Sequence, residues 1–481
     1  MGDKKRPYIF YDVVISICST CYQKIEGKTV FEDSKVYLLK RCPQHGHERV
    51  LIADDVDYYR LCREVFIKPP EMPLVYNTPV KWGCPYDCGL CTDHEQHSCL
   101  TLVEICDYCN LRCPVCYASS GPERQQFRDL PLVEKMLDAI VRNEGHPDVV
   151  QISGGEPTMH PDFFAVLNLA KARPIRHLMV NTNGIRIAQD EEFVKRLVVY
   201  AEDFEVYLQF DSFERAPLMA LRGADLRRVR QDAIERLNRY NISTNLVVTL
   251  KKGLNDGEIG TIIDYALQQP CIRGVTFQPI QDAGRLEEFN PATDRLTLTE
   301  VRRKILEQTK VFKPEDIIPV PCHPDSLAMG YALKFGGRVT PLTSMIPPEV
   351  LISAGGNTIL YEQESVVREN LFKLFATNHS PKSGAGSLHE LLCCLPQVLV
   401  PDGLGYENIF RIIIMQFIDA HSFDVRSVKK TCVHIVHPDG RLIPFDTYNL
   451  FYRDNLERTR LAPLREKVEV SLGLSSPAGA L

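Results

Sequence analysis

The sequence predicts an α/β protein in which a partial (β/α)6 TIM-like barrel follows a rubredoxin- or zinc-ribbon-like domain and precedes an α+β cap. Three observations support this fold. Over residues 100–293, six short apolar segments alternate with amphipathic segments, as parallel strands alternate with their crossover helices. Within residues 1–70, two pairs of metal-ligand residues flank a strand-like stretch. Residues 294–481 mix helical and strand-like patterns without the βα repeat.

The composition is that of an ordinary globular protein. Hydrophobic residues make up 44% of the 481 residues, charged residues 25%, and the formal net charge is -6. This leaves no basic footprint for nucleic acid. The longest apolar run, IFRIIIMQFI, is interrupted by Arg411 and Gln416 and is typical of a buried strand. Since MGDKKRPYIF also lacks the apolar core of a signal peptide, we expect a cytoplasmic protein without a transmembrane segment or a nucleic-acid partner.

Cysteine is frequent and unevenly placed. Of 17 cysteines, 12 lie between Cys18 and Cys116. In a long chain without secretory features, such clustering indicates metal ligation rather than disulfide bonds.

The first metal site is predicted in residues 1–70, where CSTC is followed by the strand-like KTVFEDSKVYLLK and then by CPQHGH. This is the two-knuckle spacing of a tetrahedral zinc or rubredoxin-type iron site. A β-hairpin of reduced cysteines without a metal is the alternative. A fully ligated ion would be structural, because it leaves no open position for a substrate. The expected ligands are Cys18, Cys21, Cys42 and His45, with His47 or Cys62 in reserve for the fourth position.

The barrel is predicted to begin after the Pro-rich linker KPPEMPLVYNTP and the cysteine-containing segment 71–99. Amphipathic segments such as PLVEKMLDAIVRNEG supply the helices between its strands. The six expected strands are LTLVEI, DVVQI, HLMVN, EVYLQF, TNLVVTL and GVTFQPI. Ligands of such folds bind where the strands end, and there the sequence carries CNLRCPVC, GGEP, NTNG and FDS.

Two cysteine triplets share the spacing C-x3-C-x2-C: CPYDCGLC at 84–91 and CNLRCPVC at 109–116. Three thiolates so spaced can bind different irons of one cubic iron–sulfur cluster. A cluster that only carries electrons is best ligated by four cysteines, whereas one that binds a cosubstrate needs a free iron. The first triplet has further thiols close behind it, while the second is followed by a helix and the glycine-bearing strand ISGGEP.

We therefore predict an auxiliary cluster at the first triplet and a catalytic cluster at the second. The auxiliary ligands would be Cys84, Cys88 and Cys91, completed by Cys99 or Cys106. The catalytic ligands would be Cys109, Cys113 and Cys116.

CNLRCPVC after a first strand, combined with GGEP on the second, resembles the radical S-adenosylmethionine (SAM) superfamily over roughly Leu100 to Arg285. The resemblance implies that the catalytic triplet holds a [4Fe–4S] cluster whose fourth iron chelates SAM. One departure is Val115, where the family often has an aromatic residue, so either Tyr117 or aliphatic groups would pack the adenine. The implied SAM contacts are Gly154, Gly155, Glu156, Asn183 and Asp211.

The chemistry implied by the resemblance is reductive cleavage of SAM. An electron enters the SAM-bound cluster, the sulfonium C–S bond breaks, and the 5′-deoxyadenosyl radical takes a hydrogen atom from an unactivated C–H bond. The expected partner is therefore an electron donor: a reductase, a ferredoxin or a flavodoxin.

A narrower resemblance rests on the two adjacent triplets, the CSTC…CPQHG pair and the later HPDG…PF..YN element. Together these are similar to the subgroup that holds archaeal tetraether lipid synthase and methanopterin-methylating enzymes. It implies C–C bond formation on a lipid tail as the first expectation, or methyl transfer to a small pterin-like substrate. A non-enzymatic iron–sulfur electron carrier and a zinc-ribbon binding module are the remaining alternatives.

Four further cysteines lie in the predicted cap. Their spacing supports a third cluster no better than ordinary buried thiols. They are Cys322, Cys393, Cys394 and Cys432.

Overall fold

The computed structural model describes residues 6–286, 289–335, 337–345, 352 and 408–471. Cys393 and Cys394 lie outside the described residues.

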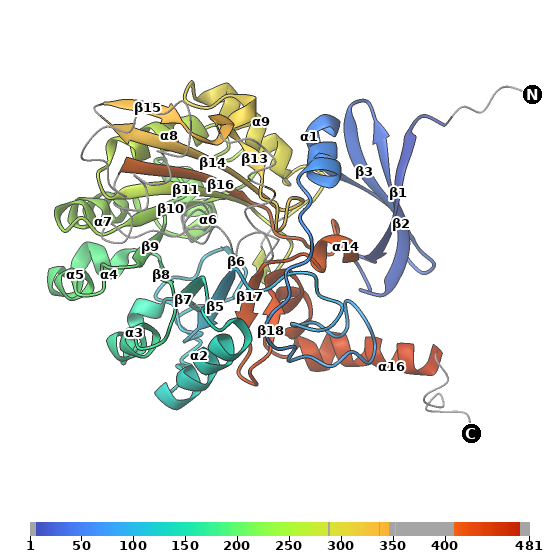
Figure 1. Ribbon diagram of the computed structural model, residues 1–481, viewed down its shortest axis with the longest axis horizontal. Helices are drawn as coiled ribbons and strands as arrows, with labels where there is room; N and C mark the ends of the chain where they lie inside the picture. Colours follow the sequence, from blue (N-terminus) through green and yellow to red (C-terminus); the bar gives the residue numbers. More distant parts are fainter. Residues whose placement is uncertain (1–5, 287–288, 336, 346–351, 353–407, 472–481) are drawn as a thin grey trace, which may run out of the picture.

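A four-stranded antiparallel sheet forms the N-terminal domain, with strands in the order β1-β2-β3-β4. Val14, Leu38 and Val50, one from each of three strands, pack together on one face. The sheet stands to one side of the barrel in Figure 1. Its strands are β1 (Ile9–Ile17), β2 (Lys24–Glu32), β3 (Lys35–Cys42) and β4 (Gly46–Ala53).

Six parallel strands form the centre of the large sheet, in the order β11-β10-β9-β8-β7-β5. They coincide with the six strands predicted from the sequence, so the predicted fold class is confirmed. The strands are β5 (Leu100–Glu104), β7 (Val149–Ser153), β8 (His177–Thr182), β9 (Phe204–Gln209), β10 (Thr244–Leu250) and β11 (Ile272–Pro279).

Helices cover the outer face of these strands, and the main apolar core lies between the two layers. Each helix joins consecutive strands, and several begin at a capping side chain, such as Asp129, whose carboxylate accepts from the amide of Leu132 at 3.0 Å. These helices are α2 (Leu130–Glu144), α3 (Phe163–Lys171), α4 (Ile185–Gln189), α5 (Glu191–Val198), α6 (Arg215–Arg222), α7 (Arg227–Arg239), α8 (Ile259–Gln268) and α9 (Leu298–Gln308).

The C-terminal part of the chain extends this sheet at both edges. β16 pairs in parallel with β11 and β17 pairs in parallel with β5, and Figure 1 shows both orange-red strands beside these barrel strands. Strands from both sides of residue 293, where the cap was expected to begin, therefore belong to one continuous sheet. The added strands are β13 (Ile318–Pro319), β14 (Leu327–Phe335), β15 (Arg338–Pro341), β16 (Ile409–Met415), β17 (Val433–Val436) and β18 (Leu442–Pro444).

Several short strands and helices lie outside the two layers of the barrel. The two-residue strands β6 (Val115–Cys116) and β12 (Arg285–Leu286) pair with each other outside the large sheet. The described part of the chain also contains the α-helices α1 (Val56–Arg60), α14 (Val425–Val428), α15 (Phe445–Thr447) and α16 (Ala462–Ser471), besides short 3-10 and π helices.

The inside of the curled sheet has an apolar floor formed by Val149, Met179, Tyr207 and Val247, one from each of β7 to β10. Nearer the amino ends of the strands, a buried ion pair joins β16 to β9, because Arg411 donates to both carboxylate oxygens of Glu205 at 2.5 and 2.6 Å. Described side chains thus fill the amino end of the barrel, and a cavity opens toward the carboxyl ends of the strands.

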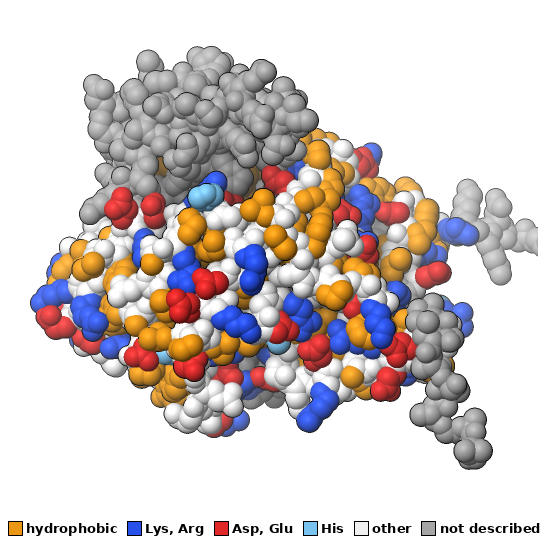
Figure 2. Space-filling view, turned by 60° about the horizontal axis from the view of Figure 1, so that its bottom comes forward, with side chains coloured by type: hydrophobic (Ala, Val, Ile, Leu, Met, Phe, Trp, Pro, Cys, Tyr) orange, Lys and Arg blue, Asp and Glu red, His pale blue; other side chains and the backbone are white. Residues whose placement is uncertain are grey.

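The surface carries both signs of charge. On the face shown in Figure 2, Lys and Arg side chains are interspersed with Asp and Glu. None of the described helices combines the length and apolar character needed to cross a bilayer.

Candidate active site and metal centres

A cavity opens inside the barrel at the carboxyl ends of the strands. Its wall includes the three cysteines of CNLRCPVC, both glycines of GGEP, and Asn183. The structure therefore brings the second triplet together with two of the three strand-end motifs expected to bind SAM.

The loop that carries the second triplet is held in place by a residue that follows the last barrel strand. Arg285, after β11, donates from Nε to the carbonyl oxygen of Cys113 at 2.6 Å, and from its guanidinium to that of Ser120 at 2.5 Å. Burial raises the pKa of Cys109 and of Cys113, and the nearby Glu156 carboxylate adds to the effect at Cys109. The thiols would lose their protons on binding iron, since a metal ion outweighs such local effects.

The two glycines of GGEP allow the end of β7 to pack against the cysteine loop. The amide of Gly155 donates to the carbonyl oxygen of Cys106 at 2.8 Å, and the next amide donates to Tyr108 at 2.8 Å. A Cβ atom at Gly155 would lie 2.0 Å from the Tyr108 oxygen, and one at Gly154, whose φ is +130°, would lie 2.3 Å from the Cys106 oxygen. Glycine is needed at both positions for this contact as well as for any approach of a ligand.

The side chain of Glu156 is used within the protein. Its buried carboxylate accepts from the hydroxyls of Thr158 and Thr182 at 2.6 and 2.7 Å and from the amide of Asn183 at 2.7 Å. Burial raises the pKa of Glu156, and these hydrogen bonds oppose the shift. The carboxylate fixes the end of β8, so that Asn183 faces the cavity and donates to Asn110 at 2.7 Å.

Asp211 also lies behind the cavity wall. Arg222 of α6 donates to its two carboxylate oxygens at 2.7 and 2.6 Å, and Arg230 lies 3.7 Å away. Burial alone would raise the pKa of Asp211, but the two guanidinium groups hold it below its usual range. The group that reaches the cavity is Arg222. Arg222 could not be predicted as a cavity residue from a local motif; the one available signal is that a buried carboxylate needs a cation.

Carboxamide side chains line the middle of the cavity. They belong to Gln151 on β7, Asn181 on β8, Gln209 on β9 and Gln278 on β11. Sequence reasoning missed them, because single polar residues inside strands usually face solvent. Among the described residues that line the cavity, Arg222 is the only charged one, and it is paired with Asp211.

Aromatic side chains form another part of the wall. The rings of Phe417 and Phe445 are stacked with centroids 3.9 Å apart, and Tyr117 meets Phe445 edge-on at 5.0 Å. All three line the cavity. Tyr117 is thus available to pack a ring, as expected from its position next to Cys116.

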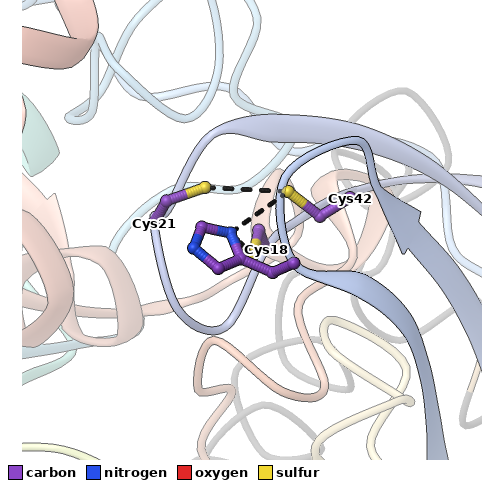
Figure 3. Close-up of side chains that lie close together, drawn as sticks. Cys18, Cys21 and Cys42 are labelled. Carbon is purple, nitrogen blue, oxygen red and sulfur yellow. Dashed lines mark hydrogen bonds between the residues drawn. The ribbon is translucent and has the colours of Figure 1, made fainter.

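The four ligands expected in the N-terminal domain meet at one point between the β1–β2 and β3–β4 turns (Figure 3). Cys21 and Cys42 have their sulfur atoms 3.8 Å apart, and Nδ1 of His45 lies 3.5 Å from Cys18 Sγ and 3.4 Å from Cys42 Sγ. Thiolates on one tetrahedral zinc ion lie about 3.8 Å apart, given a Zn–S bond of about 2.3 Å. The reserve ligands are not needed: His47 is exposed, and Cys62 is buried in the main core.

The first triplet lies in the loop ahead of β5. Cys88 and Cys91 are buried and Cys84 is half-buried. The amide of Cys88 donates to the hydroxyl of Tyr452 at 3.0 Å, so the loop rests on the C-terminal part of the chain. Burial and the neighbouring Cys84 thiol raise the pKa of Cys88.

The two thiols expected to complete that cluster have other neighbours. Cys106 Sγ donates to the carbonyl oxygens of Glu156 at 3.5 Å and Tyr108 at 3.6 Å, beside the GGEP turn. Cys99 lies with Cys322 and Cys432, and the three sulfur atoms are all within 4.8 Å of one another. The identity of the fourth ligand of the first triplet therefore stays a prediction.

The Cys99–Cys322–Cys432 group was not expected as a unit. Cys322 and Cys432 have sulfur atoms 3.5 Å apart, and His97 Nε2 lies 3.6 Å from Cys99 Sγ. Hydrogen bonds from the other two thiols hold the pKa of Cys322 well below its usual range, and the Lys68 ammonium contributes. The lowered pKa favours the thiolate form of Cys322, which is the form that binds metals.

Two segments of the chain match known protein families. Residues 103–266 match the family described as the radical SAM superfamily, and residues 10–54 match the HMPTM N-terminal zinc ribbon domain.

Two curated relatives illustrate the range of similar proteins. A 7,8-dihydro-6-hydroxymethylpterin dimethyltransferase of Methanocaldococcus jannaschii is 29% identical over 492 residues, which cover 94% of this chain and 96% of the relative. A GTP 3′,8-cyclase of Pectobacterium atrosepticum is 25% identical over 230 residues, 46% of this chain and 68% of the relative. Among solved structures, Streptococcus suis SuiB bound to precursor peptide SuiA matches with a TM-score of 0.36 and 17% identity, over 44% of this chain and 45% of SuiB.

Proposed function

Because residues 103–266 place this chain among the enzymes of the radical SAM superfamily, we propose that it methylates a ring carbon of a pterin-like heterocycle. The observation that carries this proposal is the similarity to a pterin dimethyltransferase along nearly the whole of both chains, zinc ribbon included. The comparisons favour this reaction over C–C bond formation on a lipid tail, which was the first expectation from the sequence.

The lining of the cavity also favours a heterocycle over a lipid. Four carboxamides face the space in which a substrate would lie. An alkyl tail has no group to pair with them, and burying unpaired amides costs free energy. A heterocycle with ring nitrogens and a carbonyl can pair with them.

In this proposal Cys109, Cys113 and Cys116 hold the catalytic [4Fe–4S] cluster, and SAM lies against Gly154, Gly155 and Asn183. The fit rests on three thiols that face one cavity beside backbone brought close by glycines. When bound, the cluster supplies the electron that cleaves SAM. The protein fixes the cysteine loop through Arg285, positions Asn183 through Glu156, and surrounds the reacting groups with a wall that excludes water. Superfamily members need a reductant; we propose a reductase, ferredoxin or flavodoxin.

Cys84, Cys88 and Cys91 are proposed to hold an auxiliary cluster. All three lie in one loop, and Cys84 and Cys88 pack with Tyr452 and Phe451 in an apolar cluster formed largely by the C-terminal segment. An apolar shell of this kind limits access of solvent to a cluster and influences its potential.

Cys99, Cys322 and Cys432 are proposed to hold a single metal ion. Their sulfur atoms are as close as those of the N-terminal site, whereas thiolates that bind different irons of a cubane are farther apart. These three cysteines come from three distant parts of the chain, so an ion there would join the first triplet's segment to the C-terminal segment.

The N-terminal ligands are proposed to bind zinc or iron with a structural role. Three thiols and one imidazole complete a tetrahedral set and leave no position for a substrate.

The proposed function is tested with anaerobically reconstituted protein, SAM, a low-potential reductant and 6-hydroxymethyl-7,8-dihydropterin. Mass spectrometry of the pterin should show the addition of one or two methyl groups, dependent on SAM and reductant. A Cys109→Ala variant should give none. The matched control is Cys271→Ala, which removes a buried thiol that belongs to no cysteine group. SAM cleavage without any methylated pterin would contradict the proposed substrate.

The electron-carrier alternative is separated by spectroscopy. Binding of SAM to a free iron should change the electron paramagnetic resonance spectrum of the reduced protein. A spectrum that is indifferent to SAM, with the clusters intact, would favour a carrier.

A further inference from the structure

The residues that face the barrel lumen form successive layers two residues apart. The floor consists of Val149, Met179, Tyr207 and Val247. Because side chains alternate along a strand, the next inward positions are two residues further along each strand, roughly 7 Å higher. These positions carry Gln151, Asn181, Gln209 and Thr249.

Gln278 on β11 lines the same cavity. Its Nε2 donates to the hydroxyl of the floor residue Tyr207 at 3.2 Å. We call Gln151, Asn181, Gln209 and Gln278 the carboxamide layer. Two residues higher come Ser153 and Asn183, at the level of the GGEP turn and the cysteine loop. The layer therefore lies below the position proposed for SAM.

The carboxamide layer has hydrogen-bonding capacity that the protein does not use. Gln151 is 3% exposed, yet its Nε2 has no partner within the described part of the chain. The contacts from Gln209 Nε2 to Asn181 Oδ1, and from Asn181 Nδ2 to Ser153 Oγ, are both 3.5 Å, long for hydrogen bonds. At the rim, Gln281 Oε1 is a buried acceptor that also lacks a partner among the described residues. Buried amides that lack a hydrogen-bond partner, or have only long contacts, indicate a ligand that pairs with them.

The chemistry of the layer specifies the kind of ligand. Carboxamides both donate and accept, and Arg222, the one charged residue among the described residues of the cavity wall, is paired with Asp211. The nearby stacked rings of Phe417 and Phe445 provide a flat apolar surface. A neutral, planar heterocycle with alternating donors and acceptors along one edge can pair with the carboxamides, needs no charged partner and can lie against the aromatic rings.

We propose that the carboxamide layer is the specificity-determining surface for the 2-amino-4-oxopyrimidine edge of the substrate. This rests on the proposed function and extends it. The edge offers an amino group and a ring N–H as donors, and a ring nitrogen and a carbonyl oxygen as acceptors. Pterins and guanine share it, and the two relatives are named for a pterin and for GTP.

The first test compares two ligands on the wild-type enzyme. Reconstituted holoenzyme with SAM is dialysed anaerobically against 6-hydroxymethylpterin or 6-hydroxymethyllumazine, in which a carbonyl replaces the 2-amino group. We expect the lumazine to bind about tenfold more weakly, since the 2-amino donor becomes a carbonyl acceptor and the adjacent ring nitrogen changes from an acceptor to an N–H donor. Equal binding of the two would overturn the inference.

The second test changes the layer itself. Gln151→Met and Gln278→Met keep side-chain volume and remove the amide, and each should weaken binding of the pterin about five- to tenfold. The affinity for SAM, and the amount of 5′-deoxyadenosine formed without pterin, should fall much less than the affinity for the pterin, because SAM is proposed to lie in the layer above. Gln231→Met, the same change on the exposed surface of α7, is the matched control.

The outcomes separate this inference from the proposed function. Pterin that binds and is methylated equally in wild type and both layer variants would overturn the inference alone. A wild-type enzyme that cleaves SAM but neither binds nor methylates the pterin would overturn both.

Discussion

Two carboxylates expected to contact SAM are already engaged by the protein. Glu156 ties Thr182 and Asn183 together, and Asp211 is held by Arg222. A buried carboxylate is stable only when it is paired or fully hydrogen-bonded. We therefore predict that contacts with SAM are made by Asn183 and Arg222, the groups that these carboxylates position.

Arg222→Ala should destabilise the protein strongly, because it leaves the Asp211 carboxylate buried and removes its bidentate partner. Loss of one member of a buried pair costs about 3–5 kcal/mol in the free energy of unfolding. Urea unfolding, followed anaerobically by circular dichroism, measures the effect. The control is Arg228→Ala, which removes an exposed guanidinium 3.4 Å from Asp232 and should cost less than about 1 kcal/mol. Equal effects of the two substitutions would refute the structural role of the Arg222–Asp211 pair.

At the scale of elements, the N-terminal sheet is joined to the barrel through His421. Its Nδ1 lies 2.8 Å from Glu48 on β4, and its Nε2 lies 3.2 Å from Asp282 after β11. Burial would lower the pKa of His421, but these two carboxylates, with Asp419, raise it from 6.5 to about 9. Arg295, which pairs with Asp419, opposes the shift slightly.

This contact predicts a pH dependence of stability. A histidine whose pKa is raised on folding stabilises the native state fully below its unfolded value of 6.5, and the contribution is lost as the pH rises through about 9. The loss should be on the order of 2 kcal/mol. Urea midpoints of wild type and His421→Gln across this range measure it.

The His421→Gln variant keeps a hydrogen-bonding side chain but cannot titrate. Its stability should therefore change less over the same pH range. A wild-type midpoint that is flat, or a variant as steep as wild type, would be inconsistent with a charged His421 at this junction.

Removal of the N-terminal metal should loosen only the small sheet. Cys18→Ser with Cys42→Ser eliminates two of its four ligands, so metal analysis should show the loss of the zinc or iron bound there. Hydrogen exchange in β1–β4 should become at least about tenfold faster, because a site of this kind contributes directly to folding. Exchange in β7–β10 should not change. Cys271→Ser serves as the control, and unaltered protection of β1–β4 in the double variant would argue against a structural metal.

At the scale of the whole molecule, the sequence predicted what local patterns determine. The six barrel strands are short apolar runs, and the four N-terminal ligands and the two triplets are defined by close spacing. All six strands are present, and the structure brings the N-terminal ligands together.

What the sequence could not predict depends on contacts between distant residues. The pairing of β16 with β11 and of β17 with β5 joins segments far apart in the chain, and no local pattern records such a register. Cys99, Cys322 and Cys432 have no motif spacing for the same reason. The carboxamide layer becomes visible only once the curled sheet turns alternate residues of four strands toward one space.

We propose that the cluster held by the second triplet, and not the one held by the first, cleaves SAM. The measurement that tests it most directly is 5′-deoxyadenosine formation, with iron and sulfide quantification, in wild type and two triple variants. One variant replaces the second triplet (Cys109, Cys113 and Cys116) by alanine and the other replaces the first triplet (Cys84, Cys88 and Cys91). We expect each to lose about four irons, and only the first variant to lose SAM cleavage entirely. Cleavage that persists without the second triplet, or disappears only without the first, would contradict the account.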